Sequence, residues 1–405
     1  MSRLAGLMAT FVVATAVTAQ PPDTVKVQHQ HTGHEGMSHG TGATRMPPMP
    51  KGMRMPAIPG MEGIQPKMVP YLPGAGLDLA TIPSATPRKL LDLKDGDSLD
   101  LVAGFVKRKI RGKELVMYGF NGQYPGPLIR VKQSATIVVR FRNRLDLPSA
   151  VHWHGIRLDN RYDGAPGVTQ DPVPVGGEFI YRIHFPDPGI YWYHPHVRED
   201  IQQDLGLYGN MIVESPEPNY YNPVNDEQVL MLDDILMDDE GLLPYGRDVG
   251  NYSIMGRFGN VFLVNGEPDY HLDVKKGDVV RFLLTNVANT RTFNFSFGAN
   301  PIKLIGADIG RFEREEMVET VVIAPAQRYV VEVRFDTAGT YQITNQVQAL
   351  NNFLGEFEHS VDTLGTITVS EQPTAQNHAA TFSVLRTLPS VSAEVEPYRK
   401  YFDRE

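Results

Sequence analysis

The sequence contains an internal repeat of domain length, and this repeat limits the folds that the chain can adopt. The segment that begins at Phe185 reads FPDPGIYWYHPHV, and the segment that begins at Phe335 reads FDTAGTYQITNQV. Upstream, each copy also contains an Asn-Gly pair followed by the run VVRF, at 121–141 and at 265–282. Repetition at this spacing indicates two homologous domains in tandem.

Both copies have the local pattern of β-structure. Runs such as TIVVRF (136–141) and EFIYRI (178–183) mix β-branched and aromatic residues with partial alternation, and Gly and Pro separate the runs. Amphipathic segments of helical length are scarce. This pattern predicts an all-β fold made of sandwich or barrel domains, which we place at residues 88–216 and 217–371.

The N-terminus has the features of a secretory signal. Arg3 precedes an uncharged run at 4–17, and Val17-Thr18-Ala19 is an acceptable cleavage site. The run is shorter than the roughly 20 residues of an easy membrane span. We therefore expect residues 1–19 to be a signal peptide, no membrane span after its cleavage, and a periplasmic or secreted protein.

Residues 20–87 are rich in Pro and Gly and are predicted to be a disordered leader, because they cannot bury enough apolar surface to offset the entropy of ordering. Imidazole and thioether groups together suit copper. The candidate auxiliary copper ligands are His29, His31, His34, His39, Met46, Met49, Met53 and Met55. A flexible exported tail without a binding role is an equally weighted alternative.

The composition excludes several classes of function. The 405 residues contain no cysteine, which rules out disulfides, thiol catalysis, zinc–thiolate sites and iron–sulfur clusters within them. A metal must then be held by His, Met or carboxylate groups. The net charge is −9 and no long basic run occurs, so no nucleic-acid partner is expected.

Two His-x-His pairs in the first copy are candidate metal ligands. His152 and His154 flank a Trp, and His194 and His196 flank a Pro. In an extended chain residues i and i+2 point to the same side, so each pair presents two imidazoles together. Four converging imidazoles suit copper or zinc, and imidazole alone does not choose between them.

The second copy lacks these histidines. Thr344 and Gln346 occupy the positions of the second pair, and the segment 293–295 corresponds to the first pair with a small shift. We therefore expect metal chemistry in the first domain and a structural role for the second.

These motifs resemble a known family. HWHG (152–155), the pairs DG (163–164) and TQ (169–170), YWYHPH (191–196), and GLYG together look like the first domain of a multicopper oxidase of the laccase type. The segment GFNGQYPGPLIR also resembles the opening of that domain. The likeness extends over 88–371 and implies tandem cupredoxin-like Greek-key β-sandwich domains.

The resemblance also implies cofactors and partners. In that family a trinuclear copper cluster, with one type 2 ion and a type 3 pair, reduces dioxygen to water with electrons from a phenolic substrate or Cu(I). Eight histidines from four His-x-His motifs hold the cluster, two motifs in the first domain and two in the last. By resemblance His152 would bind the type 2 copper, and His154, His194 and His196 the type 3 pair.

Asp163, eleven residues after His152, matches an acidic residue that the family places near the cluster, where it would orient water and relay protons. An ordinary Asp-Gly turn is the alternative interpretation of this residue.

The chain departs from the family at the type 1 copper site and in the last domain. A complete oxidase takes electrons through a type 1 copper, whose thiolate ligand comes from a His-Cys-His motif in the last domain. No cysteine is present, and the family's His-x-x-His-x-His motif is absent. At the equivalent position of the first domain, the middle residue of the His-x-His motif is Pro195 and not Cys. We expect 372–405 to be the stub of a missing third domain, so that half of the trinuclear ligands are present.

Three interpretations follow. The chain is a truncated or frameshifted piece of a three-domain exported oxidase, which the charged ending favours. Alternatively, it is a non-catalytic copper-binding or copper-buffering protein. A relative that serves protein interaction is disfavoured because all four histidines are retained. For the polypeptide as given we expect partial copper binding without oxidase turnover; no sequence feature specifies an oligomeric state.

The remaining acidic residues and histidines are not expected to bind a metal. The acidic group lacks the spacing of a calcium loop, so we expect solvated strand ends at Asp233, Asp234, Asp238, Asp239 and Glu240. Isolated histidines are expected at the surface, namely His184, His271, His359 and His378.

Overall fold

The computed structural model describes residues 70–247, 252, 256–308, 310–351 and 356–401. The predicted signal peptide and the candidate leader ligands, from His29 to Met55, lie outside the described residues. Both β domains belong to one compact unit. Within the described residues, no helix has the length and apolar character needed to cross a membrane.

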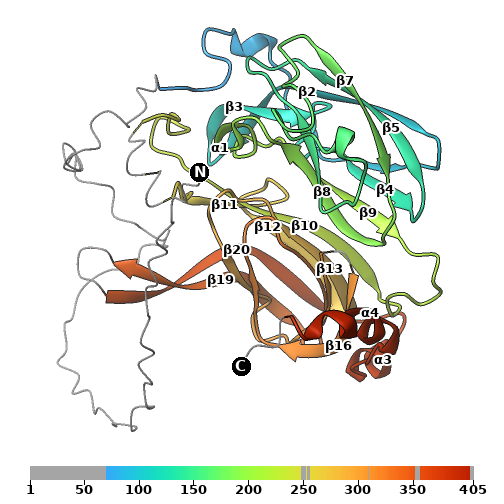
Figure 1. Cartoon of the computed structure of the whole chain (residues 1–405). Coiled ribbons are helices and arrows are strands. Elements are labelled where there is room, and N and C mark those ends of the chain that lie inside the picture. The colour runs from blue at the N-terminus through green and yellow to red at the C-terminus, as the bar shows by residue number, and fades with distance from the viewer. Residues whose placement is uncertain (1–69, 248–251, 253–255, 309, 352–355, 402–405) are drawn as a thin grey trace, which may run out of the picture. The chain divides into compact units, whose positions relative to one another are not determined.

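The first domain consists of two sheets (Figure 1). One has the strand order β3-β2-β5-β7 and the other β1-β4-β9-β8-β6. The strands are β1 (Leu90–Asp92), β2 (Ser98–Ile110), β3 (Lys113–Phe120), β4 (Leu128–Lys132), β5 (Thr136–Asn143), β6 (Val151–His154), β7 (Glu178–His184), β8 (Gly189–Pro195) and β9 (Gly209–Glu214). Alternating residues such as those of β5 and β7 face a core that includes Trp153, Tyr181 and Tyr193.

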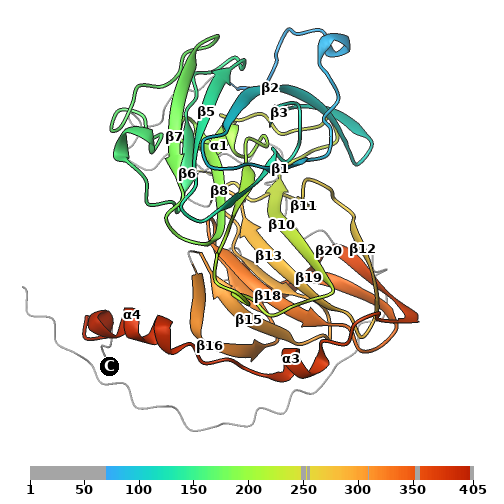
Figure 2. The ribbon, with the colours of Figure 1, turned by 90° about the vertical axis from the view of Figure 1, so that its right-hand side faces the viewer.

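The second domain repeats this architecture with more strands (Figure 2). Its sheets have the orders β11-β10-β13-β18-β15-β16 and β12-β20-β19-β14-β17. The strands are β10 (Asp226–Ile235), β11 (Val261–Val264), β12 (Tyr270–Lys276), β13 (Val279–Asn286), β14 (Phe293–Ser296), β15 (Ile302–Ala307), β16 (Gly310–Val318), β17 (Val321–Ile323), β18 (Arg328–Arg334), β19 (Gly339–Asn351) and β20 (Glu356–Pro373). The predicted all-β, tandem cupredoxin-like fold is confirmed.

The sequence repeat corresponds to repeated hydrogen bonds. The Tyr191 hydroxyl donates to the Asp187 carbonyl at 3.1 Å, and the Tyr341 hydroxyl donates to the Thr337 carbonyl at 2.8 Å. This back-bond from a Tyr to the backbone a few residues upstream fixes a corner of a β-sandwich. The two copies therefore share their internal bracing as well as their strands.

An apolar cluster joins the two domains. Ile190 of the first domain packs in it with Leu283 and Val330 of the second. A buried hydrogen bond adds to the contact, since the Asn210 side chain donates to Thr285 Oγ1 at 2.8 Å. Because this cluster lies beside β8, the second domain supports a strand that carries a candidate ligand.

Three expectations differ from the structure. The first concerns the leader, which was predicted to be disordered as far as residue 87. Tyr71 forms a backbone bridge with Tyr245, and its hydroxyl donates to Asp146 at 2.8 Å. Thr86 forms a bridge with Gln123. Residues 70–87 therefore belong to the folded region, because their polar groups pair with it.

The second difference concerns residues 372–405, predicted as a stub. The segment contains α3 (Ala379–Ser383), which contacts β18, and α4 (Pro389–Arg399), which lies beside β16 (Figure 2). Between the helices, Arg386 donates to the buried Glu315 at 2.6 Å. This described part of the segment packs against the second domain.

The third difference concerns the acidic group. Asp233 and Asp234 are buried, with 1% and 2% of their surface exposed, so the expectation of solvated strand ends is wrong for these two. Both lie on β10, a strand enclosed by β11 and β13. Their carboxylates have buried partners instead, Tyr208 at 2.7 Å and Arg291 at 2.6 Å.

Candidate metal centre

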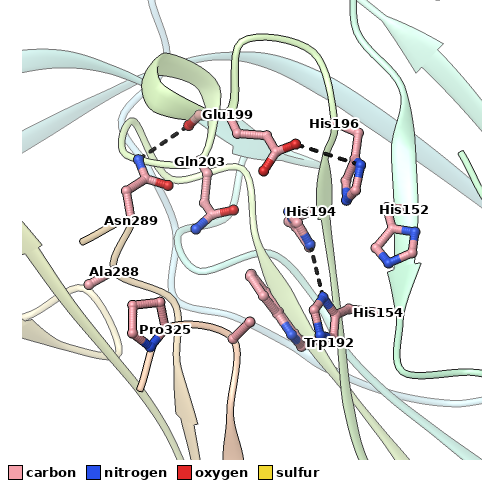
Figure 3. Close-up of a pocket in the computed structure, with 11 residues that line it drawn as sticks. His152, His154, Trp192, His194, His196, Glu199, Gln203, Ala288, Asn289 and Pro325 are labelled. Carbon is pink, nitrogen blue, oxygen red and sulfur yellow. Dashed lines mark hydrogen bonds and ion pairs between the residues drawn. The ribbon is translucent and has the colours of Figure 1, made fainter. Parts of the chain in front are cut away.

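The sheet register brings the two His-x-His pairs together. β6 and β8 are antiparallel neighbours in which His152 lies opposite His194. The ligand atoms of His152, His194 and His196 all lie within 4.8 Å of one another. Figure 3 shows these imidazoles converging from the two strands. Within the described residues, this is the one group of three or more potential ligands at such distances.

His154 completes the set from the other side of His194. The Nδ1 atom of His154 lies 3.3 Å from the Nε2 atom of His194. Two nitrogens bound to one tetrahedral ion, each at about 2.0–2.1 Å, are separated by roughly 3.3–3.4 Å. The observed separation is therefore compatible with a shared metal ion.

A backbone carbonyl orients His152. The Nδ1 atom of His152 lies 2.7 Å from the Asp163 carbonyl oxygen and 3.5 Å from Asp163 Oδ1. A carbonyl oxygen only accepts, so Nδ1 carries the proton and Nε2 is left for a metal. Ligating histidines in metalloproteins are commonly held in this way.

The turn at Asp163 and Gly164 depends on the glycine. Gly164 has φ +77°, and a Cβ there would fall 1.9 Å from the Val151 carbonyl oxygen. The Asp-Gly turn is therefore required to bring the Asp163 carbonyl to His152. A proton relay through the Asp163 carboxylate stays a prediction.

His194 is held by stacking. Its ring lies parallel to that of Trp192, with the centroids 3.9 Å apart and 9° between the planes. His194 is buried, and its Nδ1 atom has no partner of hydrogen-bond geometry among the described residues. An unpaired polar atom in the interior costs about 1–3 kcal/mol, and the Nε2 atom, which faces His154, is the nitrogen that this ring offers to a metal ion.

The electrostatics keep the imidazoles neutral. Burial, together with the nearby Arg328 guanidinium, lowers the pKa of His154 to about 3. Burial also lowers the pKa of His152 and His196, and that of His194 well below its usual range. Neutral imidazole is the form that binds metals. Nitrogen ligands without thiolate suit copper among the redox metals, so the residues present fit the copper that the sequence motifs imply.

A cavity of about 290 Å³ opens onto the imidazoles. Glu199, on α1 (Glu199–Gln202), faces the site with its Oε1 atom 3.6 Å from His196 Nδ1 (Figure 3). Burial raises the pKa of the Glu199 carboxyl. The opposite wall comes from the second domain, through Ala288, Asn289, Pro325 and Ala326.

These additional residues were not predicted. Glu199 follows His196 by three positions at the start of a helix, a local spacing that points to proximity. The second-domain wall has no comparable signal, because it reaches the cavity only through the packing of the two domains.

The corresponding place in the second domain holds no imidazoles. Thr344 lies opposite Ser296 across β14 and β19, as His194 lies opposite His152. The match for His152 is therefore Ser296, one residue beyond the segment 293–295 expected from the sequence. Elsewhere, His184 and His271 are exposed and bond to Thr136 and Asp273, in agreement with surface positions.

Comparisons with known proteins agree with this geometry. Two family models described as multicopper oxidase match residues 105–218 and 227–369. Copper resistance protein A of Pseudomonas syringae pv. tomato is 36% identical over 166 residues, which is 40% of this chain and 27% of the relative. Multicopper oxidase MmcO of Mycobacterium tuberculosis is 32% identical over 53% of this chain and 47% of its own length.

A solved structure supports the same assignment. The multi-copper oxidase from Pseudomonas thermotolerans superimposes with a TM-score of 0.61 at 28% identity, over 76% of this chain and 68% of that chain. The chain spans about a quarter to about half the length of the curated relatives named above. With two family models covering both β domains, the chain belongs to the multicopper oxidase family.

Proposed function

We propose that this chain supplies the first-domain half of the copper centre of an exported oxidase that couples one-electron oxidation of a phenolic substrate or Cu(I) to the reduction of dioxygen to water. The observation that carries the proposal is the convergence of His152, His154, His194 and His196 on one cavity. Bound copper would supply the one-electron redox chemistry.

The protein's own residues prepare this site. Burial holds the imidazoles neutral, and the Asp163 carbonyl orients His152. The cavity admits a molecule as small as dioxygen. Asp163 and Glu199 are the carboxylates beside the imidazoles, and we assign them to proton delivery.

These 405 residues alone are not expected to turn over substrate. They contain no cysteine, and electron entry in the family needs a copper–thiolate site. The second candidate, a non-catalytic copper-binding or copper-buffering protein, is favoured by this same observation.

Different observations support the proposed location and the proposed reducing substrate. Residues 1–19 favour export to the periplasm or the medium. Relatives named copper resistance protein A favour a role with copper ions. Oxidation of Cu(I) is therefore the activity to test first.

The test begins with copper titration of the purified chain, followed by electron paramagnetic resonance of the loaded protein. We expect bound copper with nitrogen ligands and no intense absorption near 600 nm. Oxygen uptake with Cu(I) or a phenol should be absent. Steady uptake would overturn the partial-site proposal, and failure to bind copper would overturn both candidate functions.

The nucleotide sequence downstream of Glu405 separates the two candidates. His-x-x-His-x-His and His-Cys-His motifs in any frame would establish a divided oxidase. Their absence would favour the binding protein.

A further inference from the structure

An arginine of the second domain lies against the ligand-bearing loop of the first. Gly155, directly after His154, has φ +86°, and a Cβ at this position would fall 2.4 Å from Arg328 Nη2. The guanidinium therefore occupies the space that a side chain at position 155 would need. Two constraints, the backbone conformation and this neighbour, require glycine here.

The same guanidinium bonds to the second ligand-bearing strand. Arg328 Nε donates to the Ile190 carbonyl at 3.1 Å, and Ile190 belongs to β8, as does His194. Arg328 is 4% exposed. It lies beside the apolar cluster of Ile190 and Val330, which excludes water from this contact.

Its remaining nitrogen reaches the wall of the cavity. Arg328 Nη1 donates to the Ala326 carbonyl at 3.1 Å and pairs with Asp308 at 2.8 Å. Ala326 lines the cavity and has φ +70°, a conformation that costs a non-glycine residue about 1–2 kcal/mol. The bond to Arg328 helps to hold this strained turn in place.

We propose that Arg328 is a positioning residue for the copper centre, holding the ends of β6 and β8 in register with the cavity wall. The inference rests on the proposed function and deepens it. Arg328 acts through Gly155 and Ile190 and does not touch the metal. The copper-free domain thereby sets the separation between His154 and His194.

The chemistry of the side chain explains why arginine is needed. A guanidinium presents donors in a rigid planar fork, so one group addresses the Ile190 carbonyl, the Ala326 carbonyl and Asp308 from a fixed geometry. A lysine ammonium is a single flexible point charge. Lysine at position 328 would keep the charge but lose the fork.

The test compares Arg328→Lys and Arg328→Met with a matched control, Arg311→Lys. Arg311 is another largely buried arginine of the second domain, and it bonds to Glu217 at 2.8 Å and to the Tyr220 carbonyl at 3.1 Å. Both partners lie between β9 and β10. The control therefore removes an arginine fork without touching β6 or β8.

The first readout needs no copper. In the metal-free protein, the imidazole NMR signals of His154 and His194 should move in both Arg328 variants and stay in place in the control. Unchanged signals in Arg328→Met would overturn the inference. If wild type binds no copper, the proposed function fails while this comparison still decides the role of Arg328.

The second readout is the copper site itself. We expect copper affinity to fall about 10–100-fold in the Arg328 variants, with altered hyperfine splitting in electron paramagnetic resonance, because groups that orient ligands have effects of this size. Wild-type affinity and spectrum in both variants would overturn the inference.

A double-mutant cycle guards against simple loss of stability. Gly155→Ala should weaken copper binding less in Arg328→Met than in wild type, because the clash with the guanidinium is then absent and only the backbone strain at φ +86° stays. Full additivity of the two losses would contradict a shared contact.

Discussion

The two domains have the same scaffold but different surfaces at one place. Both contain the tyrosine back-bond, from Tyr191 and from Tyr341. At the paired positions of the ligand face, however, His152 lies opposite His194 in one domain, and Ser296 lies opposite Thr344 in the other. The same β-sandwich thus forms with or without imidazoles at these positions, because the bracing and the imidazoles come from different residues.

The largest effect is expected from removing ligands. His152→Ala combined with His194→Ala should reduce copper affinity by more than the roughly 10–100-fold typical of residues that only support ligands. Ser296→Ala combined with Thr344→Ala, at the matched positions of the second domain, should leave it unchanged. Competition with a chelator of known affinity measures both. Copper retention by the histidine variant would place the site elsewhere.

The second prediction concerns two glycines with positive φ. Gly164→Ala should lower the free energy of unfolding by about 3 kcal/mol, because the new Cβ meets the Val151 carbonyl in a strained conformation. Gly298→Ala, in the second domain, has φ +69° but 3.6 Å of clearance, so about 1 kcal/mol is expected. Urea denaturation compares them. Equal losses would show that the turn at Gly164 is no more constrained than a positive-φ glycine of the second domain.

The third prediction is a pH dependence specific to the first domain. The folded-state pKa of His154, about 3, lies below its unfolded value near 6.5. The unfolded chain therefore binds more protons in acid, and metal-free protein loses stability as the pH falls from 6.5 toward 3. At pH 4.5, His154 accounts for a loss of about 2 kcal/mol.

A His154→Asn variant should show a smaller loss of stability between pH 7 and pH 4.5 than wild type. Thermal unfolding at a series of pH values makes the comparison. Identical pH profiles for wild type and His154→Asn would contradict the depressed pKa.

The smallest effects test the shared scaffold. Tyr191→Phe and Tyr341→Phe each remove one hydrogen bond and should each cost about 1 kcal/mol. Neither should alter copper affinity. Denaturant unfolding and copper titration provide the two readouts. A change in copper affinity for Tyr191→Phe would show that bracing and ligand geometry are coupled in the first domain.

The convergence of the four imidazoles was predictable because its determinants are local. Residues i and i+2 of a strand share a side, so the two His-x-His motifs announce two pairs of imidazoles. Their absence from the second copy was also visible. The pairing of Ser296 with Thr344 could not be predicted, because a short apolar segment does not specify its strand register in the sequence.

Burial of charged groups was the weakest part of the prediction. Asp233 and Asp234 resemble solvated residues in sequence, but the sheet and the domain interface enclose them with Tyr208 and Arg291. A buried polar group is tolerated where a partner is supplied. That partner comes from residues far away in the chain, so local composition does not reveal it.

The sequence by itself determined the tandem β fold, the family and the four imidazoles, since periodicity and motif spacing are properties of neighbouring residues. Tertiary structure decided which groups surround them. Gly155 and Arg328 are far apart in the chain, yet the fit of one domain against the other places a guanidinium over that glycine. Such contacts arise from packing between distant strands, which short-range pattern does not encode.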